Sequence, residues 1–317
     1  MRLPLAFDAG LARPDHMLCL HPAVAFDFAG VPADVVHPFR PTYDYWAGMG
    51  LPTTADVPGG RWPMAVVVAT RSKDQTRDLI AQAAQRADRV VVDGQKTDGI
   101  ESHYKALRQR VDIMGSVTKA HGRLFWFAAC DVSDWLDAPR DVGGGLCTRA
   151  GVFSADGVDP ASALLADYLP AALNGRVADF GAGWGYLAKA VLARGAGAVH
   201  LIEADHTALS CAQASITDPR AQFHWQDATQ HTGQYDHIVM NPPFHRGRAG
   251  DPGLGERFIK TAARCLGPKG TLWMVANAHL PYEATLQACF GHITVDTPNR
   301  QFKIFECTRP KARHWVK

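Results

Sequence analysis

The stretch that decides the fold is Val177-Ala-Asp-Phe-Gly-Ala-Gly-Trp-Gly185. A predicted strand over residues 176–180 leads through three alternating glycines into residues 186–194, where the pattern is helical. Glycine tolerates positive φ and lets a backbone approach a ligand without a Cβ in the way. A glycine turn between a strand and a helix therefore predicts an open α/β sheet with a ligand site at the carboxyl end of that strand.

The same alternation continues to the C-terminus. Asp159-Pro160 predicts the start of a helix that ends near residue 168, because aspartate caps helices and proline favours their first position. Further helices are predicted at 206–216, 255–266 and from Pro281, and further strands at 198–203, 222–225, 237–240, 271–276, 292–296 and 301–307. The last two strands are separated only by residues 297–300, so they must pair antiparallel. This half is predicted as a doubly wound, seven-stranded sheet that ends in an antiparallel hairpin.

The N-terminal half resembles a weaker copy of this pattern. Its first fifty residues show no sustained periodicity, but strands are predicted at 64–69, 89–93 and 123–128, with helices at 74–86 and 100–110. Any two α/β segments share some of this order, so duplication is a hypothesis. The N-terminal copy lacks a glycine-rich turn, and it has Thr70-Arg-Ser-Lys73 where the second copy has Asn241-Pro-Pro-Phe244. With Gly143-Gly-Gly145 as a linker, we expect a degenerate domain over 1–145 and a catalytic domain over 146–317.

Composition limits the class of protein without identifying a partner. The net charge is +2 over 317 residues, and residues 1–150 hold 17 basic against 17 acidic side chains, which is not the excess of a nonspecific nucleic-acid binder. The seven cysteines form no C-x-x-C pair, so we expect reduced thiols and no structural metal. With no membrane-length apolar run and no signal peptide pattern, we expect a cytoplasmic location away from membranes. We expect a monomer, with a homodimer as the alternative.

Acidic residues follow three successive predicted strands. Asp179 ends the first strand, where it would repel a pyrophosphate but suits the ammonium and sulfonium of S-adenosylmethionine. Glu203 ends the second and can accept hydrogen bonds from ribose hydroxyls, whereas Asp205 is better placed to cap the next helix. Asp227 follows the third strand and can accept from the adenine amino group. The predicted cofactor is S-adenosylmethionine, with S-adenosylhomocysteine as the product.

The most informative loop is Asn241-Pro-Pro-Phe244 at the end of a predicted strand. Proline fixes φ and restricts the residue before it, so this loop must be extended. An exocyclic amine is a poor nucleophile, and the Asn241 side chain with the Pro242 carbonyl can accept hydrogen bonds from both of its N–H groups. Pro243 stiffens the loop, and Phe244 can stack on the planar group. The chemistry predicted is methylation of a planar amine.

The residues after this loop are open to two interpretations each. His245 is predicted either to contact substrate or carry the released proton, or to stabilise the loop by a hydrogen bond. Arg246, Arg248 and the basic tail over 309–317 suit phosphate contacts, but solvated surface charge explains them equally well.

With these motifs in place, the sequence resembles the methyltransferase C family of bacterial enzymes that methylate guanine N2 in small-subunit ribosomal RNA. The resemblance is carried by Val92-Asp-Gly94 with Lys96-Thr-Asp-Gly-Ile100, by Lys119-Ala-His-Gly122 before Leu124-Phe-Trp-Phe127, by Gly151-Val-Phe-Ser154 with Asp159, and by Asn241-Pro-Pro-Phe-His245. It implies two tandem class I methyltransferase folds, of which the first is inactive, and ribosomal RNA or the small ribosomal subunit as partner. It further implies cofactor contacts from Phe153, Asp179, Gly181, Ala182, Gly183, Gly185, Glu203, Asp227, Ala228 and Asn241, and target-base contacts from Asn241 and Phe244.

Two alternatives remain open at this point. Adenine N6 in nucleic acid and glutamine N5 in protein are also planar amines that such a loop can hold. A non-catalytic RNA-binding or assembly factor could retain the same fold, although the intact loop and glycine turn argue against it.

Overall fold

The computed structural model describes residues 2–243, 245–246, 249–250 and 252–311, with side chains for 2–243 and 253–311. It divides into two compact units, one of residues 1–138 with 149–151 and one of residues 139–148 with 152–317. The boundary predicted at residue 145 falls in a short hairpin, in which β8 (Arg140–Asp141) pairs antiparallel with β9 (Cys147–Thr148). The glycine run predicted as a linker is the turn of this hairpin, and Gly143, Gly144 and Gly145 all have positive φ.

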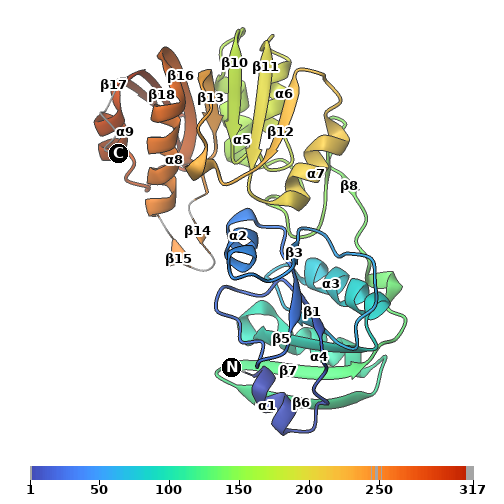
Figure 1. The fold of residues 1–317 in the computed structure, drawn as a ribbon. Helices are drawn as coiled ribbons and strands as arrows, with labels where there is room; N and C mark the ends of the chain where they lie inside the picture. The colour runs from blue at the N-terminus through green and yellow to red at the C-terminus, as the bar shows by residue number, and fades with distance from the viewer. Residues whose placement is uncertain (1, 244, 247–248, 251, 312–317) are drawn as a thin grey trace. The chain divides into compact units, whose positions relative to one another are not determined.

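The second unit contains the seven-stranded sheet that the sequence predicts (Figure 1). Its order is β12-β11-β10-β13-β16-β18-β17, and the last two pairings, β16 with β18 and β18 with β17, are antiparallel. The strands are β10 (Arg176–Phe180), β11 (Ala198–Glu203), β12 (Ala221–Trp225), β13 (Tyr235–Met240), β16 (Leu266–Asn277), β17 (Phe290–Asp296) and β18 (Phe302–Pro310). The chain reverses its direction of travel across the sheet between β10 and β13, so a ligand site is expected at their carboxyl ends.

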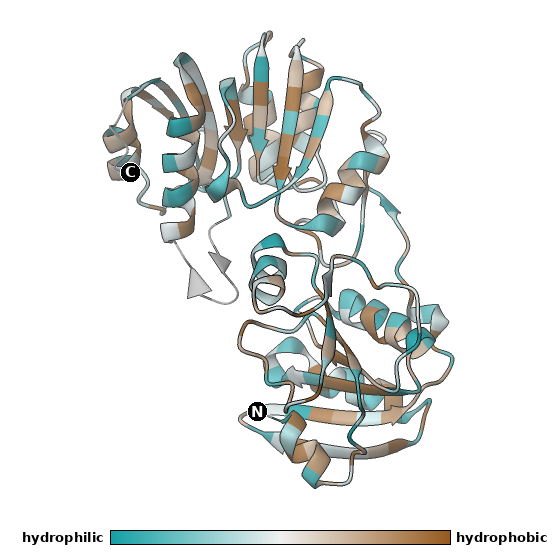
Figure 2. Cartoon of the chain, viewed as in Figure 1, coloured by the Kyte–Doolittle hydropathy of each residue, from teal (hydrophilic) through white to brown (hydrophobic). Residues whose placement is uncertain are grey.

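Helices cover both faces of this sheet because successive strand residues point to opposite sides. Val177 and Val239 face a core completed by α5 (Pro160–Tyr168), α6 (Tyr186–Leu192) and α7 (His206–Ser215). Their neighbours Ala178 and Ile238 face a second core under α8 (Pro252–Cys265) and α9 (Glu283–Cys289). Apolar colour is accordingly concentrated along the strands in Figure 2.

Two predicted caps start helices on the first of these faces. Asp159 accepts a hydrogen bond from the Ser162 amide at 2.8 Å and so begins α5. Asp205 accepts from the Thr207 amide at 2.9 Å and begins α7. Each carboxylate satisfies an amide that the helix itself leaves unpaired.

The first unit repeats this topology strand for strand. Its sheet order is β3-β2-β1-β4-β5-β7-β6, with antiparallel pairing of β5 with β7 and of β7 with β6. The strands are β1 (Met17–Leu20), β2 (Ala33–Val36), β3 (Thr53–Thr54), β4 (Ala65–Val68), β5 (Arg89–Gln95), β6 (Ile113–Lys119) and β7 (Gly122–Ala128). The helices are α1 (Leu3–Asp8), α2 (Arg40–Gly48), α3 (Lys73–Arg86) and α4 (Ile100–Arg108), and the short 3-10 turns of the chain are η1 (Lys96–Asp98), η2 (Ser133–Trp135) and, in the second unit, η3 (Ala228–Gln230). The fold is duplicated, as the sequence predicts.

In the first unit, the segment equivalent to the Asn241–Phe244 loop caps a helix. β4 occupies the place of β13, and the residues after it are Thr70 to Lys73. Ser72 accepts a hydrogen bond from the Gln75 amide at 3.2 Å to start α3, and the Thr76 hydroxyl accepts one from the Thr70 amide at 2.9 Å. These groups serve local structure.

No helix in the described part of the chain is long and apolar enough to cross a membrane. Within the same residues, no group of three or more His, Cys, Asp or Glu side chains is arranged to hold a metal ion.

Candidate active site

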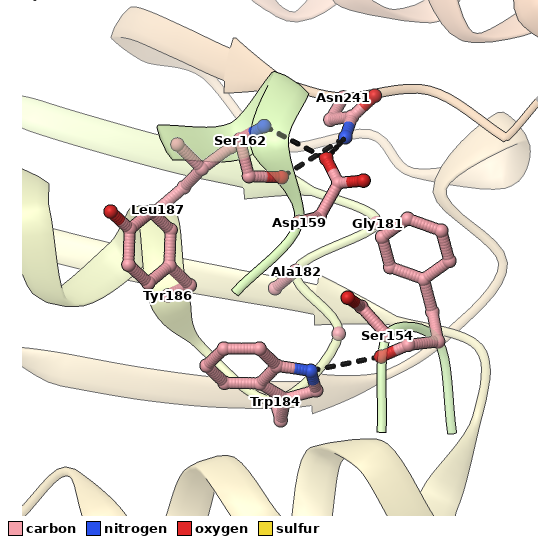
Figure 3. A pocket seen from close by; sticks show the side chains of 11 residues that line it. Ser154, Asp159, Ser162, Gly181, Ala182, Trp184, Tyr186, Leu187 and Asn241 are labelled. Atoms are coloured by element: carbon pink, nitrogen blue, oxygen red, sulfur yellow. Dashed lines mark hydrogen bonds between the residues drawn. The ribbon is translucent and has the colours of Figure 1, made fainter. Parts of the chain in front are cut away.

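A pocket opens where the glycine turn meets the end of β13 (Figure 3). Five of the residues predicted to bind cofactor line it together: Phe153, Gly181, Ala182, Gly183 and Asn241. The walls also include Ser154, Asp159, Ser162, Trp184, Tyr186 and Leu187. The pocket therefore lies at the switch point between β10 and β13, where the topology predicts a ligand.

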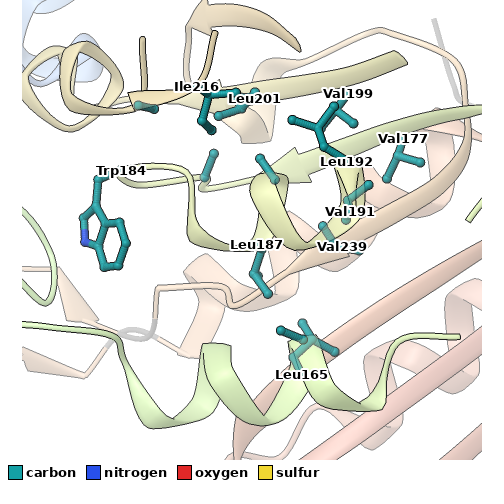
Figure 4. Close-up of a cluster of buried hydrophobic side chains, with 14 of the residues drawn as sticks. Leu165, Val177, Trp184, Leu187, Val191, Leu192, Val199, Leu201, Ile216 and Val239 are labelled. Atoms are coloured by element: carbon teal, nitrogen blue, oxygen red, sulfur yellow. The ribbon is translucent and has the colours of Figure 1, made fainter. Parts of the chain in front are cut away.

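The positions of the turn require glycine for different structural reasons. All three have positive φ, at 74° for Gly181, 55° for Gly183 and 92° for Gly185. A Cβ on Gly183 would meet no described atom within 4 Å, so it would project into open space beside the pocket. A Cβ on Gly185 would instead stand 2.7 Å from Cδ1 of Ile216, which faces this turn in the core beneath it (Figure 4). Gly183 keeps the pocket clear, and Gly185 allows the turn to pack on α7.

Glu203 holds the turn in shape from the neighbouring strand. Its Oε2 accepts a hydrogen bond from the Gly183 amide at 2.7 Å, and its Oε1 accepts one from the Asp205 amide at 2.8 Å. Burial raises the pKa of this carboxyl to about 7, and the amide of Asp205 offsets part of that effect. Each carboxylate oxygen has a further lone pair, so Glu203 can still accept from a ligand hydroxyl at the edge of the turn.

Asp179 is the most unusual acid in the structure. It is 1% exposed, and neither of its oxygens has a hydrogen-bond partner at bonding distance among the described residues. Burial raises its pKa to about 8; the Ala188 amide lowers it and the negative charge of Glu203 raises it further. A buried carboxyl without a cationic or donor partner is costly. Asp179 is not among the residues that line the pocket, but it precedes the lining residue Gly181 by two positions. Such a group close to a ligand pocket in the chain fits a site whose cation arrives with the ligand.

The segment that contains Phe153 is tied to the turn by Trp184. The indole Nε1 donates to the Phe153 carbonyl at 2.9 Å, while the Phe153 side chain itself is 61% exposed. A large aromatic side chain exposed at a pocket rim is available to a ligand. The sequence alone did not indicate this tie.

The Asn241 side chain is held by the start of α5. Its Nδ2 donates to Oδ2 of Asp159 at 2.9 Å and to Oγ of Ser162 at 3.0 Å. Pro242 is buried and Pro243 is exposed. Asp159 was predicted only as a helix cap and Ser162 was not predicted at all.

The remaining predicted residues lie outside the pocket or outside the description. Oδ1 of Asp227 accepts from both the amide and the hydroxyl of Thr229, at 2.8 and 2.7 Å, which starts η3. Ala228 is 3% exposed and belongs to the second core. His245 and Arg246 form a two-residue strand, β14 (His245–Arg246), that pairs with β15 (Ala249–Gly250); their side chains, together with Phe244, Arg248 and residues 312–317, are outside the described set.

Comparison with known proteins places this site in a family. The methyltransferase small domain model matches residues 143–306. The ribosomal RNA small subunit methyltransferase C of Shewanella oneidensis is 33% identical over 244 residues, which are 72% of this chain and 71% of that protein. The chain belongs to this methyltransferase family. The protein of the same name from a second Shewanella strain is 32% identical over 243 residues, with the same coverage.

A solved structure extends the likeness to the whole fold. The T. thermophilus 16S rRNA N2 G1207 methyltransferase (RsmC), in complex with AdoMet and guanosine, matches with a TM-score of 0.79 at 23% identity. The match covers 94% of this chain and 89% of that one. Both tandem units of this methyltransferase thus have counterparts in a known member of the fold.

Proposed function

We propose that this methyltransferase transfers a methyl group from S-adenosylmethionine to the exocyclic N2 amine of a guanine in small-subunit ribosomal RNA. The observation that carries the proposal is the pocket that Gly181, Gly183 and Asn241 share. It brings a cofactor turn and an amine-accepting side chain together at one sheet edge. The substrate class is supported by the names of the relatives and by the guanosine bound in the T. thermophilus protein.

The residues around the pocket fit the cofactor. We assign Asp179 to the positive charge of its amino-acid end, because neither oxygen of this buried carboxyl has a hydrogen-bond partner at bonding distance among the described residues. We assign Glu203 to the ribose hydroxyls and Gly183 to close backbone approach. When bound, S-adenosylmethionine supplies a sulfonium methyl group that even a weak nucleophile can accept, and S-adenosylhomocysteine remains.

The chain itself contributes orientation. Oδ1 of Asn241 and the Pro242 carbonyl accept hydrogen bonds from the target amine and hold its nitrogen toward the cofactor side of the pocket. Phe244 is assigned to stacking on the base. Alignment of this kind accounts for large rate factors without a covalent intermediate. A base inside an RNA helix has to be flipped out to reach the pocket.

The test is a labelling experiment with methyl-labelled S-adenosylmethionine offered to naked ribosomal RNA, small ribosomal subunits, DNA and total protein. We expect label in N2-methylguanine of small-subunit RNA. Label in adenine N6 or in glutamine would move the acceptor to the alternative planar amines, and label in no acceptor would favour a non-catalytic role.

A variant tests the assigned residue directly. Asn241→Ala should lower turnover by about 100-fold or more, the loss seen when one transition-state hydrogen-bonding group is removed. Cofactor affinity, measured by calorimetry, should stay close to the wild-type value. Near-normal turnover in this variant would contradict the mechanism.

A further inference from the structure

Both hydrogens of the Asn241 side-chain NH2 group are used in hydrogen bonds to the protein. An amide NH2 has two hydrogens to donate, and Nδ2 of Asn241 gives one to Asp159 and one to Ser162. Figure 3 shows the amide oxygen on the side away from both partners. The nitrogen is therefore committed to the protein, and the oxygen is the end left to meet a substrate.

Chemistry prevents the reverse orientation. A 180° rotation of the amide would place its oxygen where the nitrogen now lies, 2.9 Å from Oδ2 of Asp159. Two acceptor oxygens at that distance repel each other, and both Nδ2 hydrogens would lose their partners. Asp159 cannot turn away at low cost, because the same Oδ2 accepts from the Ser162 amide at 2.8 Å and caps α5.

We propose that Asp159 and Ser162 are positioning residues that fix the polarity of Asn241 and thereby restrict the acceptor to groups that donate a hydrogen bond. The inference rests on the proposed function. An exocyclic amine offers N–H to the fixed oxygen, whereas the ring nitrogens N3 and N7 and the O6 carbonyl of guanine offer lone pairs and are rejected. The pair thus selects the N–H groups of the base over its lone-pair atoms N3, N7 and O6.

The helix cap and the amide contact can be separated by exchanging the two groups. Asn241→Asp places a carboxylate against the carboxylate of Asp159 and should lower kcat by about 100-fold. Asp159→Asn keeps one oxygen, which can take the place of Oδ2 for both the Ser162 amide and Asn241, so it should lose much less activity than Asn241→Asp. In the double variant the amide nitrogen at position 159 donates to the carboxylate at position 241, which restores this contact with reversed polarity but gives up the cap, because Oδ2 of Asp159 serves both contacts in the wild type.

We expect the double variant to recover at least about tenfold over Asn241→Asp alone, a coupling of the size seen for residues in contact. Asp159→Ser is the matched control, because serine caps a helix as well as aspartate but is too short for the second contact. Combined with Asn241→Asp, it removes the repulsion between the two carboxylates but supplies no amide donor, so it should recover clearly less than Asp159→Asn. Calorimetry gives the cofactor affinity of each variant, and turnover is compared at saturating cofactor so that the losses are read in kcat.

The outcomes separate the two levels of the argument. A wild-type protein that labels no guanine N2 overturns the proposed function and this role with it. An active wild type in which the losses of Asn241→Asp and Asp159→Asn add without recovery overturns the positioning role alone. The same is true if Asp159→Ser rescues as well as Asp159→Asn, because the cap would then be the only role of Asp159.

Discussion

Asp179 should destabilise the protein in the absence of cofactor, and Asp179→Asn should therefore make it more stable. The carboxyl is 1% exposed and has no described hydrogen-bond partner at bonding distance, and burial raises its pKa from 3.8 to about 8. Asparagine has nearly the same shape as the protonated acid but cannot ionise. The variant removes the cost of the charge and keeps the volume of the side chain.

The size of the effect follows from the pKa. The unfolded chain ionises Asp179 near pH 3.8 and the folded chain near pH 8, so the folded state holds the extra proton between these values. Stability then falls as pH rises across this window, by about 1.4 kcal/mol per pH unit. At pH 7, about three units above the unfolded pKa, the cost reaches about 4 kcal/mol. The gain in unfolding free energy from Asp179→Asn should be close to zero at pH 4 and about 4 kcal/mol at pH 7. Any buried amide N–H without an acceptor makes this gain smaller.

Urea unfolding of cofactor-free wild type and variant at pH 5, 6, 7 and 8 measures the difference. Asp218 provides a control of opposite sign, because hydrogen bonds from Arg220 hold its pKa at about 2. Its contribution is already complete above pH 3.8, so Asp218→Asn should lose a constant amount of stability over this range. A stability gain in Asp179→Asn that does not change with pH would refute the reasoning. Added S-adenosylmethionine should stabilise the wild type, by mass action, and leave Asp179→Asn unaffected.

The remaining predictions concern the same site and the core behind it. Cofactor affinity of the wild type should fall by roughly tenfold per pH unit below pH 8, because the cation needs the ionised form of Asp179; calorimetry at pH 6 and 8 that gave equal affinities would contradict this. Gly183→Ala should weaken cofactor binding at a stability cost of about 1–2 kcal/mol for its positive φ, whereas Gly185→Ala should cost more in urea unfolding because its Cβ meets Ile216 at 2.7 Å. Burial lowers the pKa of His231 to about 4, so the folded state favours the neutral imidazole. The contribution of His231 to stability is therefore lost as pH falls from 6.5 toward 4. Between pH 7 and pH 5, the unfolding free energy should fall less in His231→Gln than in wild type.

Sequence alone predicted most of the strongly patterned elements, but it missed some of ordinary length, including α2 (Arg40–Gly48) and β6 (Ile113–Lys119). The strands at 176–180 and 198–203 match β10 and β11 in both bounds, because each lies directly before a turn or a helix cap. β1 (Met17–Leu20) and β2 (Ala33–Val36) were missed. Each has only four residues and is buried on both faces, and a run that short cannot be assigned to strand or helix by its periodicity. Pairing with β2 and β4 in the folded sheet is what makes β1 a strand.

In the candidate site, too, the sequence predicted contacts between neighbouring residues but not contacts between residues far apart in the chain. The glycines at 183 and 185 look alike in the sequence because both need positive φ, and only the folded chain shows open space beside one and Ile216 beside the other. Asp159 could be predicted as a cap because its partner, Ser162, is three residues away. Its second contact joins it to Asn241, 82 residues further along the chain. A helix cap can be aspartate, asparagine or serine with little preference. The hydrogen bond from the Asn241 amide needs a side chain at position 159 that is long enough to reach Asn241 and carries an acceptor oxygen, which excludes serine. The contact with Asn241 therefore restricts the residue types at position 159 more than the helix cap does. Substitutions at position 159 that preserve the cap, such as Asp159→Ser, distinguish a purely structural role from a positioning role.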